Sequence, residues 1–208
     1  MGIMTLTPTQ IKWLIKMKIT EYSVDAEGFV NVNGNIYISE RGLSVIPIKF
    51  GYVGGTFYCW NNNLSSLQGA PREVGGHFYC HYNNLPSLEG ASREVGGSFY
   101  CDNNNLTSLQ GAPKEVGGNF DCRFNKLTSL QGAPGEVGGE FACNNNKLTS
   151  LQGAPKEVGG HFYCWNNKLT SLQGAPREVG RDFDCSYNEF TSEPDRSFIK
   201  IGGDFVWK

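Results

Sequence analysis

The side chains of this chain best suited to chemistry are seven cysteines, which recur every 21 residues. They are Cys59, Cys80, Cys101, Cys122, Cys143, Cys164 and Cys185. A disulfide between neighbouring parallel strands is just within reach, but an inward cysteine is also a compact apolar residue that fills a core. Zinc needs four ligands in a tetrahedron, whereas a single-file ladder offers collinear sulfurs. We therefore expect reduced core thiols and no metal, which favours the cytoplasm.

Histidines and carboxylates offer a second kind of chemistry. His77 and His81 are four strand residues apart, about 13 Å, which is too far to share a metal ion. His161 should face Asp182 on the next strand, and Asp182 and Asp184 have a separation that a glycosidase could use, although surface carboxylates are usually solvated. The cysteines point inward and no serine completes a triad. The sequence thus predicts no enzyme and no cofactor.

A 21-residue unit positions all of these residues. Its clearest copy begins at Phe120, and each copy has a cysteine two residues and an asparagine five residues after its phenylalanine. The phenylalanines are Phe57, Phe78, Phe99, Phe120, Phe141, Phe162 and Phe183. Such regular repetition predicts a repeat solenoid in which each unit contacts only its neighbours.

Within the unit, Phe and Cys alternate with variable residues, which is the period of a half-buried strand. The following Leu-Thr-Ser-Leu run turns the chain back, and the Gly-Ala-Pro and Gly-Gly segments exclude a long helix. We therefore predict one parallel sheet and an irregular or 3₁₀ return side. A degenerate copy at 36–38 and a divergent last copy at 201–207 bring the count to about nine strands. The last copy comes one residue late, which predicts an insertion within residues 191–200.

The N-terminal segment predicts a capping helix. Thr7, Pro8 and Gln10 have the pattern of a helix start, and the helix should run to about Ile19. Its expected apolar stripe is Ile11, Leu14, Ile15 and Ile19. We assign residues 1–31 to a cap and connection and residues 32–208 to the solenoid.

Composition excludes several classes of protein. The 208 residues have 39% hydrophobic content and a formal charge of −2, so neither disorder nor nucleic-acid binding is indicated. Apolar stretches are far shorter than the roughly 20 residues of a membrane span. We expect a cytoplasmic protein with no nucleic-acid or membrane partner.

The segment 118–127 (GNFDCRFNKL) resembles the L-x-x-L-x-L-x-x-N-x-L pattern of leucine-rich repeats, with Phe and Cys in two of the leucine places. The short unit is similar to the bacterial effector-type subclass, and Gly-Ala-Pro-x-Glu-Val-Gly-Gly resembles repeats in phage-encoded and bacterial proteins. The resemblance covers about residues 32–208 and implies a leucine-rich-repeat fold with a concave sheet face, with a right-handed parallel β-helix as the alternative. It also implies a buried asparagine ladder of Asn62, Asn83, Asn104, Asn125, Asn146, Asn167 and Asn188.

Comparison of the copies shows where specificity could lie. Inward positions hardly change, whereas the outward strand positions vary freely. The outward positions form one aromatic patch of Tyr58, Trp60, His77, Tyr79, His81 and Tyr100, and a second of His161, Tyr163 and Trp165, with Arg123 between them. Tyr and Trp anchor protein interfaces, although exposed aromatic residues also suit strands and pair across them.

These observations favour a non-enzymatic protein-binding module, a monomer or a weak end-to-end dimer. If the resemblance to phage repeats extends to the source, the partner is a host or defence protein and the location is the host cytoplasm. Two alternatives stay open. One is a sponge for a nucleotide-like ligand held between aromatic side chains, and the other is a surface or structural repeat protein.

Overall fold

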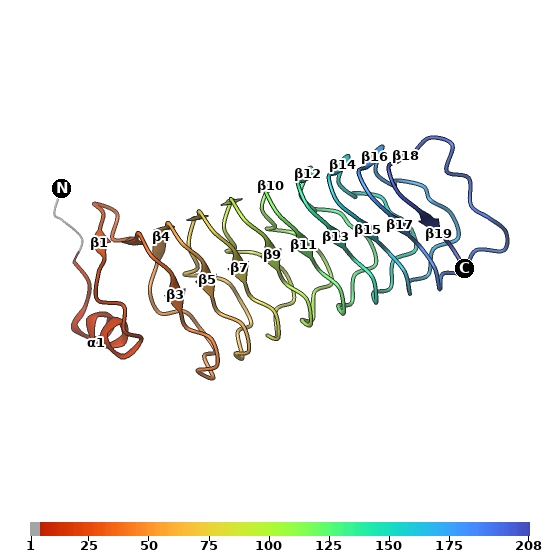
Figure 1. The fold of residues 1–208 in the computed structure, drawn as a ribbon. Coiled ribbons are helices and arrows are strands. Elements are labelled where there is room, and N and C mark those ends of the chain that lie inside the picture. Colours follow the sequence, from red (N-terminus) through yellow and green to blue (C-terminus); the bar gives the residue numbers. More distant parts are fainter. Residues whose placement is uncertain (1–4) are drawn as a thin grey trace.

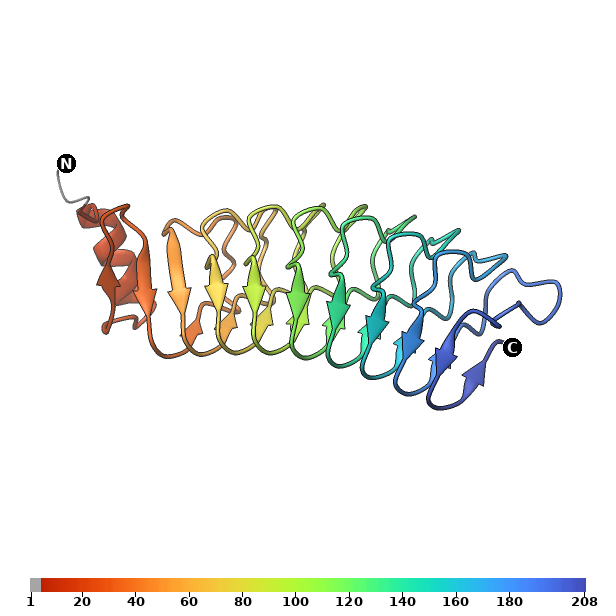
Figure 2. The same cartoon turned by 90° about the horizontal axis from the view of Figure 1, so that it is seen from above.

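The protein is a parallel β-solenoid whose 21-residue turns stack along one axis. The computed structural model describes residues 5–208. Phe120 pairs with Phe99 on one side and with Phe141 on the other, so the strand register advances by one unit from turn to turn. The helix lies at the N-terminal end of the stack and the C-terminus lies at the other end (Figure 1). The same linear stacking is visible from above (Figure 2).

Two sheets run along the stack. The first, which we call the Phe sheet, has nine parallel strands, the number of repeat copies counted in the sequence. Its strands are β3 (Ile36–Tyr37), β5 (Phe57–Tyr58), β7 (Phe78–Tyr79), β9 (Phe99–Tyr100), β11 (Phe120–Asp121), β13 (Phe141–Ala142), β15 (Phe162–Tyr163), β17 (Phe183–Asp184) and β19 (Phe205–Val206).

The second sheet, which we call the Glu-Val sheet, has ten strands. They are β1 (Ser23–Val24), β2 (Val30–Val32), β4 (Phe50–Val53), β6 (Glu73–Val74), β8 (Glu94–Val95), β10 (Glu115–Val116), β12 (Glu136–Val137), β14 (Glu157–Val158), β16 (Glu178–Val179) and β18 (Lys200–Ile201). All pairs are parallel except β1 with β2.

The second sheet corrects the prediction of a single sheet with an irregular or 3₁₀ return side. In β12, Glu136 is exposed and Val137 is buried, which is strand alternation reduced to two residues. Gly135 N and Gly138 N both donate to the preceding turn, so the backbone is paired on either side of this dipeptide. The arc from the ladder asparagine to the proline lacks regular structure, and in the described residues it contains no 3₁₀ segment. A two-residue strand is too short for its periodicity to be visible in the sequence.

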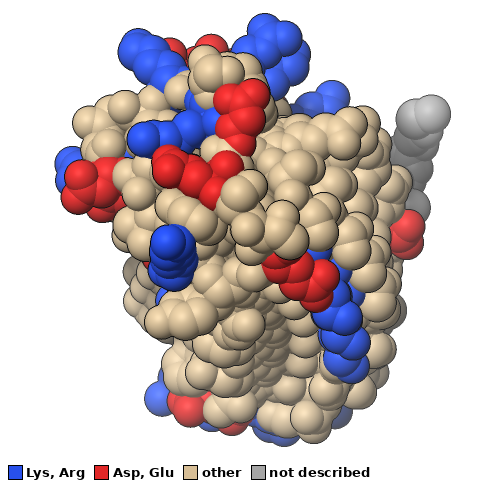
Figure 3. Space-filling view, turned by 90° about the vertical axis from the view of Figure 1, so that its right-hand side faces the viewer, with Lys and Arg blue, Asp and Glu red and all other residues tan. Residues whose placement is uncertain are grey.

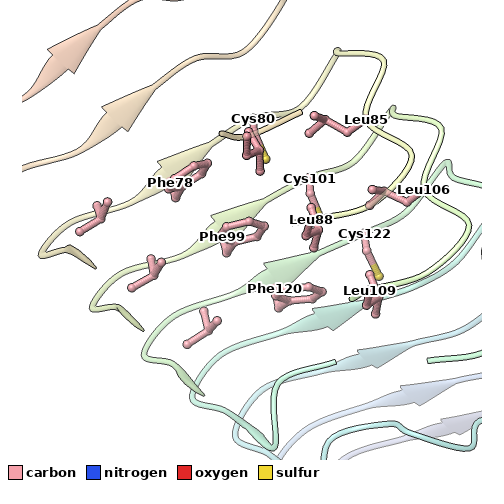
Figure 4. Packing of buried hydrophobic residues seen from close by; sticks show 14 of the residues in the cluster. Phe78, Cys80, Leu85, Leu88, Phe99, Cys101, Leu106, Leu109, Phe120 and Cys122 are labelled. Atoms are coloured by element: carbon pink, nitrogen blue, oxygen red, sulfur yellow. The ribbon is translucent and has the colours of Figure 1, made fainter. Parts of the chain in front are cut away.

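The interior is built from stacked copies of the same apolar residues (Figure 4). Phe78 stacks on Phe99 at a centroid distance of 5.0 Å, and Phe120 stacks on Phe141 at 5.4 Å. The cysteines and both leucines of each regular unit are also buried. All seven cysteines are free thiols, and burial raises their pKa, so they act as core residues.

The expected asparagine ladder is present. Asn125 Oδ1 accepts a hydrogen bond from Leu106 N at 2.9 Å, and Asn125 Nδ2 donates to Cys101 O and Cys122 O at 3.1 and 3.0 Å. The same pattern recurs from Asn62 to Asn188. Each asparagine thereby satisfies backbone groups of two neighbouring turns at the bend that follows the strand.

Glycine is required at two places in each turn. Gly132 has a φ of +90°, a conformation that is open to glycine and costly for other residues. At the Gly-Gly corner the backbones of successive turns approach closely, and a Cβ on Gly75 would lie 2.5 Å from Gly54 O. The tight stacking of turns therefore depends on the missing side chains.

The N-terminal cap is the helix α1 (Pro8–Lys16), which begins with the predicted capping box of Thr7 and Gln10. It ends three residues earlier than predicted, and residues 1–4 of the assigned cap lie outside the described part of the chain. The predicted apolar stripe is partly wrong, because Ile11 and Ile15 are 39% and 62% exposed. The buried residues are Leu14, Met17 and Ile19, and Trp13 packs near Phe50 with ring centroids 6.5 Å apart. The chain leaves the helix after Lys16, so the turn that follows supplies part of the cover.

The last turn contains the insertion expected from the sequence. Phe183 pairs with Phe205 and Val179 with Ile201, each 22 residues away instead of 21. Residues 191–198 form the loop that holds the extra length. Among the described residues, none of the helices has the length and apolar character needed to cross a membrane.

Candidate functional site

The candidate site is the outer face of the Phe sheet. Three outward positions per turn form ladders along this face: the residue before each Phe, the residue between Phe and Cys, and the residue after Cys. His77 and Arg123 are exposed. The other predicted site residues, Tyr58, Trp60, Tyr79, His81, Tyr100, His161, Tyr163 and Trp165, are half-buried and share the face with their strand neighbours.

The first aromatic patch is a continuous stack. Tyr58 stacks on Tyr79 at 5.1 Å, with the ring planes 2° apart, and Tyr79 stacks on Tyr100 at 4.8 Å. Trp60 stacks on His81 at 5.6 Å, and the rings of His77 and Tyr79 are 5.9 Å apart. The structure therefore brings all six residues predicted for this patch together.

Tyr37 extends this stack by one strand and was missed in the sequence. Its ring lies 4.8 Å from that of Tyr58, with the planes 9° apart, and the residue is 57% exposed. The sequence signal is the degenerate copy at 36–38, in which Tyr37 occupies the outward position between two buried isoleucines. Extending the outward ladder to that copy would have found Tyr37.

The second patch is smaller and separate. The ring of His161 stacks on that of Tyr163 at 5.3 Å, and Trp165 follows two residues later in the same turn. Between the two patches, the ladder of Tyr58, Tyr79 and Tyr100 is interrupted by Asp121 and Ala142, both buried. The face thus holds two aromatic areas divided by a carboxylate-bearing strip.

Asp121 is the central carboxylate of that strip. It pairs with Arg123, with Nε 3.0 Å from Oδ2, and it accepts a hydrogen bond from Arg123 N at 3.1 Å. Burial, and then the nearby Asp102 charge, raise the pKa of Asp121 to about 7, against the opposing effect of Arg123. Burial also raises the pKa of Glu140 on the next strand.

This pKa predicts a pH-dependent stability. The carboxyl group titrates near pH 4 in the unfolded chain and near 7 in the folded chain, so folding favours its protonated form. The stabilising contribution is complete below pH 4 and is lost as the pH rises through 7, at most about 4 kcal/mol. Urea unfolding from pH 5 to pH 8 should show a falling free energy of unfolding, and Asp121→Asn should flatten that fall. Asp204 is an exposed carboxylate of the same face, and Asp204→Asn should leave this pH dependence of the free energy of unfolding unchanged. If Asp121→Asn also leaves the pH dependence unchanged, the assignment is contradicted.

The ladder before each Phe has a structural role in addition to any contact role. Ser98 N donates to His77 Nδ1 at 2.9 Å, and Asn119 N donates to Ser98 Oγ at 2.9 Å. Asn35, Thr56, Asn119, His161 and Asp182 accept from the next turn in the same way. Each of these residue types has a side-chain atom that can accept a hydrogen bond, so several types can fill the position.

His161 and Asp182 form the predicted cross-strand pair. His161 Nδ1 lies 3.2 Å from Asp182 Oδ2 and 3.4 Å from Asp182 N. When neutral at Nδ1, the imidazole accepts from the backbone, and when protonated it pairs with the carboxylate. The described residues contain no group of three or more His, Cys, Asp or Glu side chains placed to hold a metal ion.

The Glu-Val sheet carries charge of both signs on its outer face. Its glutamates are exposed, and all but Glu136 directly follow an exposed Arg or Lys, such as Arg93 and Lys114. Lys200 pairs with Glu178 at 2.7 Å, and Arg72 pairs with Glu27 at 3.1 Å. Viewed from the C-terminal end, acidic and basic side chains lie beside one another around the outside, and most of the visible surface is uncharged (Figure 3).

Three further aromatic residues border the candidate face and were missed in the sequence. Tyr82, Phe124 and Tyr187 follow the third ladder by one residue and are 55%, 48% and 76% exposed. Their position varies between asparagine and aromatic residues, a signal that the comparison of copies could have used.

Comparisons with protein-family models, with curated proteins and with solved structures find no match to this chain.

Proposed function

We propose that the chain is a non-enzymatic module that binds a protein partner through the outer face of the Phe sheet. The observation that carries the proposal is the stack of Tyr37, Tyr58, Tyr79 and Tyr100, with the Trp60–His81 stack beside it. Aromatic side chains held rigidly by stacking lose little conformational freedom on binding, and such residues dominate protein interfaces.

The variation between copies supports the same proposal. Inward Phe, Cys and Leu are repeated with little change, whereas the outward residues of the same strands are not. Substitution at the outward positions does not disturb the buried core, so these positions can carry residues suited to a partner. The half-buried aromatic rings also leave their edges and hydroxyl groups available to a partner.

The alternative of a nucleotide-like ligand between the aromatic side chains fits the stack less well. Tyr58 and Tyr79 each have a ring on either side, at 4.8–5.1 Å. A planar ligand could enter this stack only by displacing a ring. The remaining alternative is a surface or structural role. Seven free thiols support a cytoplasmic location, and a cytoplasmic location favours the binding module over a surface role.

For the fold, we propose the leucine-rich-repeat type over a parallel β-helix. The asparagine ladder and the paired leucines support the leucine-rich-repeat type. The second sheet is the one feature that favours the β-helix. With the resemblance to phage-encoded repeats, the proposed partner is a host or defence protein that binding would block.

The test compares two triple variants in partner capture followed by affinity measurement. Trp60→Ala, Tyr79→Ala and His81→Ala together should weaken binding at least 30-fold, since truncating an interface anchor can cost about 2 kcal/mol or more. The fold should survive, because these side chains lie outside the core.

The matched control lies on the Glu-Val side of the molecule. Arg72→Ala, Lys114→Ala and Lys156→Ala together should leave the affinity within a few fold, because exposed charges contribute little individually. If this control abolishes binding while the folded Trp60, Tyr79 and His81 variant binds normally, the Phe-sheet face is not the recognition surface.

A further inference from the structure

The residue before each ladder asparagine adopts a left-handed backbone conformation. At seven successive turns its φ lies between +50° and +55°. We call these residues the corner column: Asn61, Tyr82, Asn103, Phe124, Asn145, Asn166 and Tyr187. Asparagine tolerates this conformation well, whereas bulky residues there are genuine outliers. Three of the seven turns thus carry an unfavourable residue where the other four carry a favourable one.

Packing does not explain the three aromatic residues. Tyr82, Phe124 and Tyr187 are each about half-exposed or more. Among the described residues, Tyr82 is the one of the three that makes a ring contact, edge-on to His81 at 5.5 Å, and His81 is itself on the candidate face. Exposed aromatic residues kept at a conformational cost therefore point to a contact outside the chain.

The charges beside the corner column indicate the chemistry of that contact. The outer face of the Phe sheet carries four accessible carboxylates, on the half-buried Glu140, Asp182 and Asp184 and the exposed Asp204, and two buried ones, Asp102 and Asp121. Its cations are Arg123, which is paired with Asp121, and the terminal Lys208. Arginine is the residue that both pairs with carboxylates and stacks on aromatic rings.

A row of lysines lies beyond the corner column, on the side away from the Phe sheet. Lys126, Lys147 and Lys168 follow the corner column by two residues and are exposed. They would repel a basic surface beyond the corner, as the carboxylates attract it before the corner. At the turn of Tyr187 the same position holds the exposed Glu189, so the lysines limit the footprint of a basic partner at the three turns from Phe124 to Asn166.

We propose that Tyr82, Phe124 and Tyr187 contact an arginine-bearing surface of the protein partner and form the edge of its binding site. This inference rests on the proposed function of the Phe-sheet face and adds to it the chemical class of the partner and three contact residues. These residues are retained for binding at the expense of stability.

The first arm of the test measures stability. Phe124→Asn should lower the equilibrium constant for unfolding about threefold to tenfold, because asparagine suits the left-handed conformation. The reverse change, Asn61→Tyr, should raise it by a similar factor, since Asn61 occupies the same position and its side chain makes no hydrogen bond in the described structure. Urea denaturation of both variants gives the two constants. Loss of stability in Phe124→Asn would show that the aromatic residue serves the fold and would overturn the inference.

The second arm measures binding with a fluorescent nona-arginine peptide, with nona-glutamate as the negative control. The wild-type chain should bind nona-arginine, and a variant with asparagine at positions 82, 124 and 187 should bind it about tenfold more weakly, from the loss of three ring contacts. A control variant, Tyr52→Asn with Phe198→Asn, removes two exposed aromatic residues elsewhere and should bind as the wild type does.

The outcomes separate this inference from the proposed function. Unchanged peptide binding by the triple asparagine variant, or no binding of nona-arginine to the wild-type chain, overturns the inference. If partner capture still depends on Trp60, Tyr79 and His81 in that case, the proposed function stands. If partner capture is also insensitive to those three residues, the proposed function falls as well.

Discussion

Replacing Asn125 by leucine is expected to lower the free energy of unfolding by about 3–5 kcal/mol. Leu106 N would lose its acceptor and stay buried without a partner, which costs about 1–3 kcal/mol. Cys101 O and Cys122 O would each keep one amide donor, from Asn104 and Asn146, so their lost bonds cost about 1 kcal/mol each. Equilibrium urea unfolding measures the sum.

The control is Asn84→Leu in the same family of bends. Asn84 is exposed and only its backbone N–H is bonded, to Leu64 O at 2.9 Å. Its replacement should change the free energy of unfolding by about 0.5 kcal/mol or less. Equal effects of the two substitutions would show that the ladder does not hold the turns together.

Removing residues 1–20 is expected to abolish folding of the whole array. Leu14, Met17 and Ile19 are buried against the solenoid, and burial of each is worth about 1.5–3 kcal/mol. Together they approach the roughly 5–15 kcal/mol of net stability of a typical domain. The deletion would also remove Trp13 from the core residue Phe50. Circular dichroism and gel filtration should show loss of the cooperative transition, and aggregation.

Excision of one internal unit is the matched control. Deleting residues 141–161 joins Glu140 to Phe162 and preserves the register of both sheets. The shorter chain should stay monomeric and cooperative, because each turn contacts only its neighbours. A linear stack is contradicted if the internal excision aggregates while the N-terminal deletion folds.

The sequence predicted those features that are repeated in every unit. The Phe and Cys positions, the asparagine ladder and the 22-residue last step depend on residues that recur in register, so seven copies reinforce one signal. The capping box was also predicted, because it is a local pattern of Thr7, Pro8 and Gln10.

The features that were missed depend on geometry between turns or on very short segments. A two-residue Glu-Val strand has too few residues to show a period, so the second sheet was not foreseen. The exposure of Ile15 depends on how α1 docks, which helical spacing alone does not determine. The left-handed conformation of Phe124 is set by the stack, and nothing in the local sequence marks it.

The candidate face was predictable as a set of positions, but the way they act was not. The copies indicated which residues point outward, whereas the stacking of four tyrosines required the register of the Phe sheet. The acceptor role of His77 and His161 follows from the backbone of the next turn, which no single copy contains.

The most direct test of the binding face is site-specific photo-crosslinking of the full chain. A photo-reactive phenylalanine analogue replaces Tyr79 on the Phe sheet in one protein and Tyr52 on the Glu-Val sheet in another, two tyrosines on different sheets. In lysate of the native host, irradiation should attach one discrete protein to the chain labelled at position 79 and none to the chain labelled at position 52. An adduct formed from position 52 and absent from position 79 would contradict the assignment of the Phe-sheet face as the binding surface.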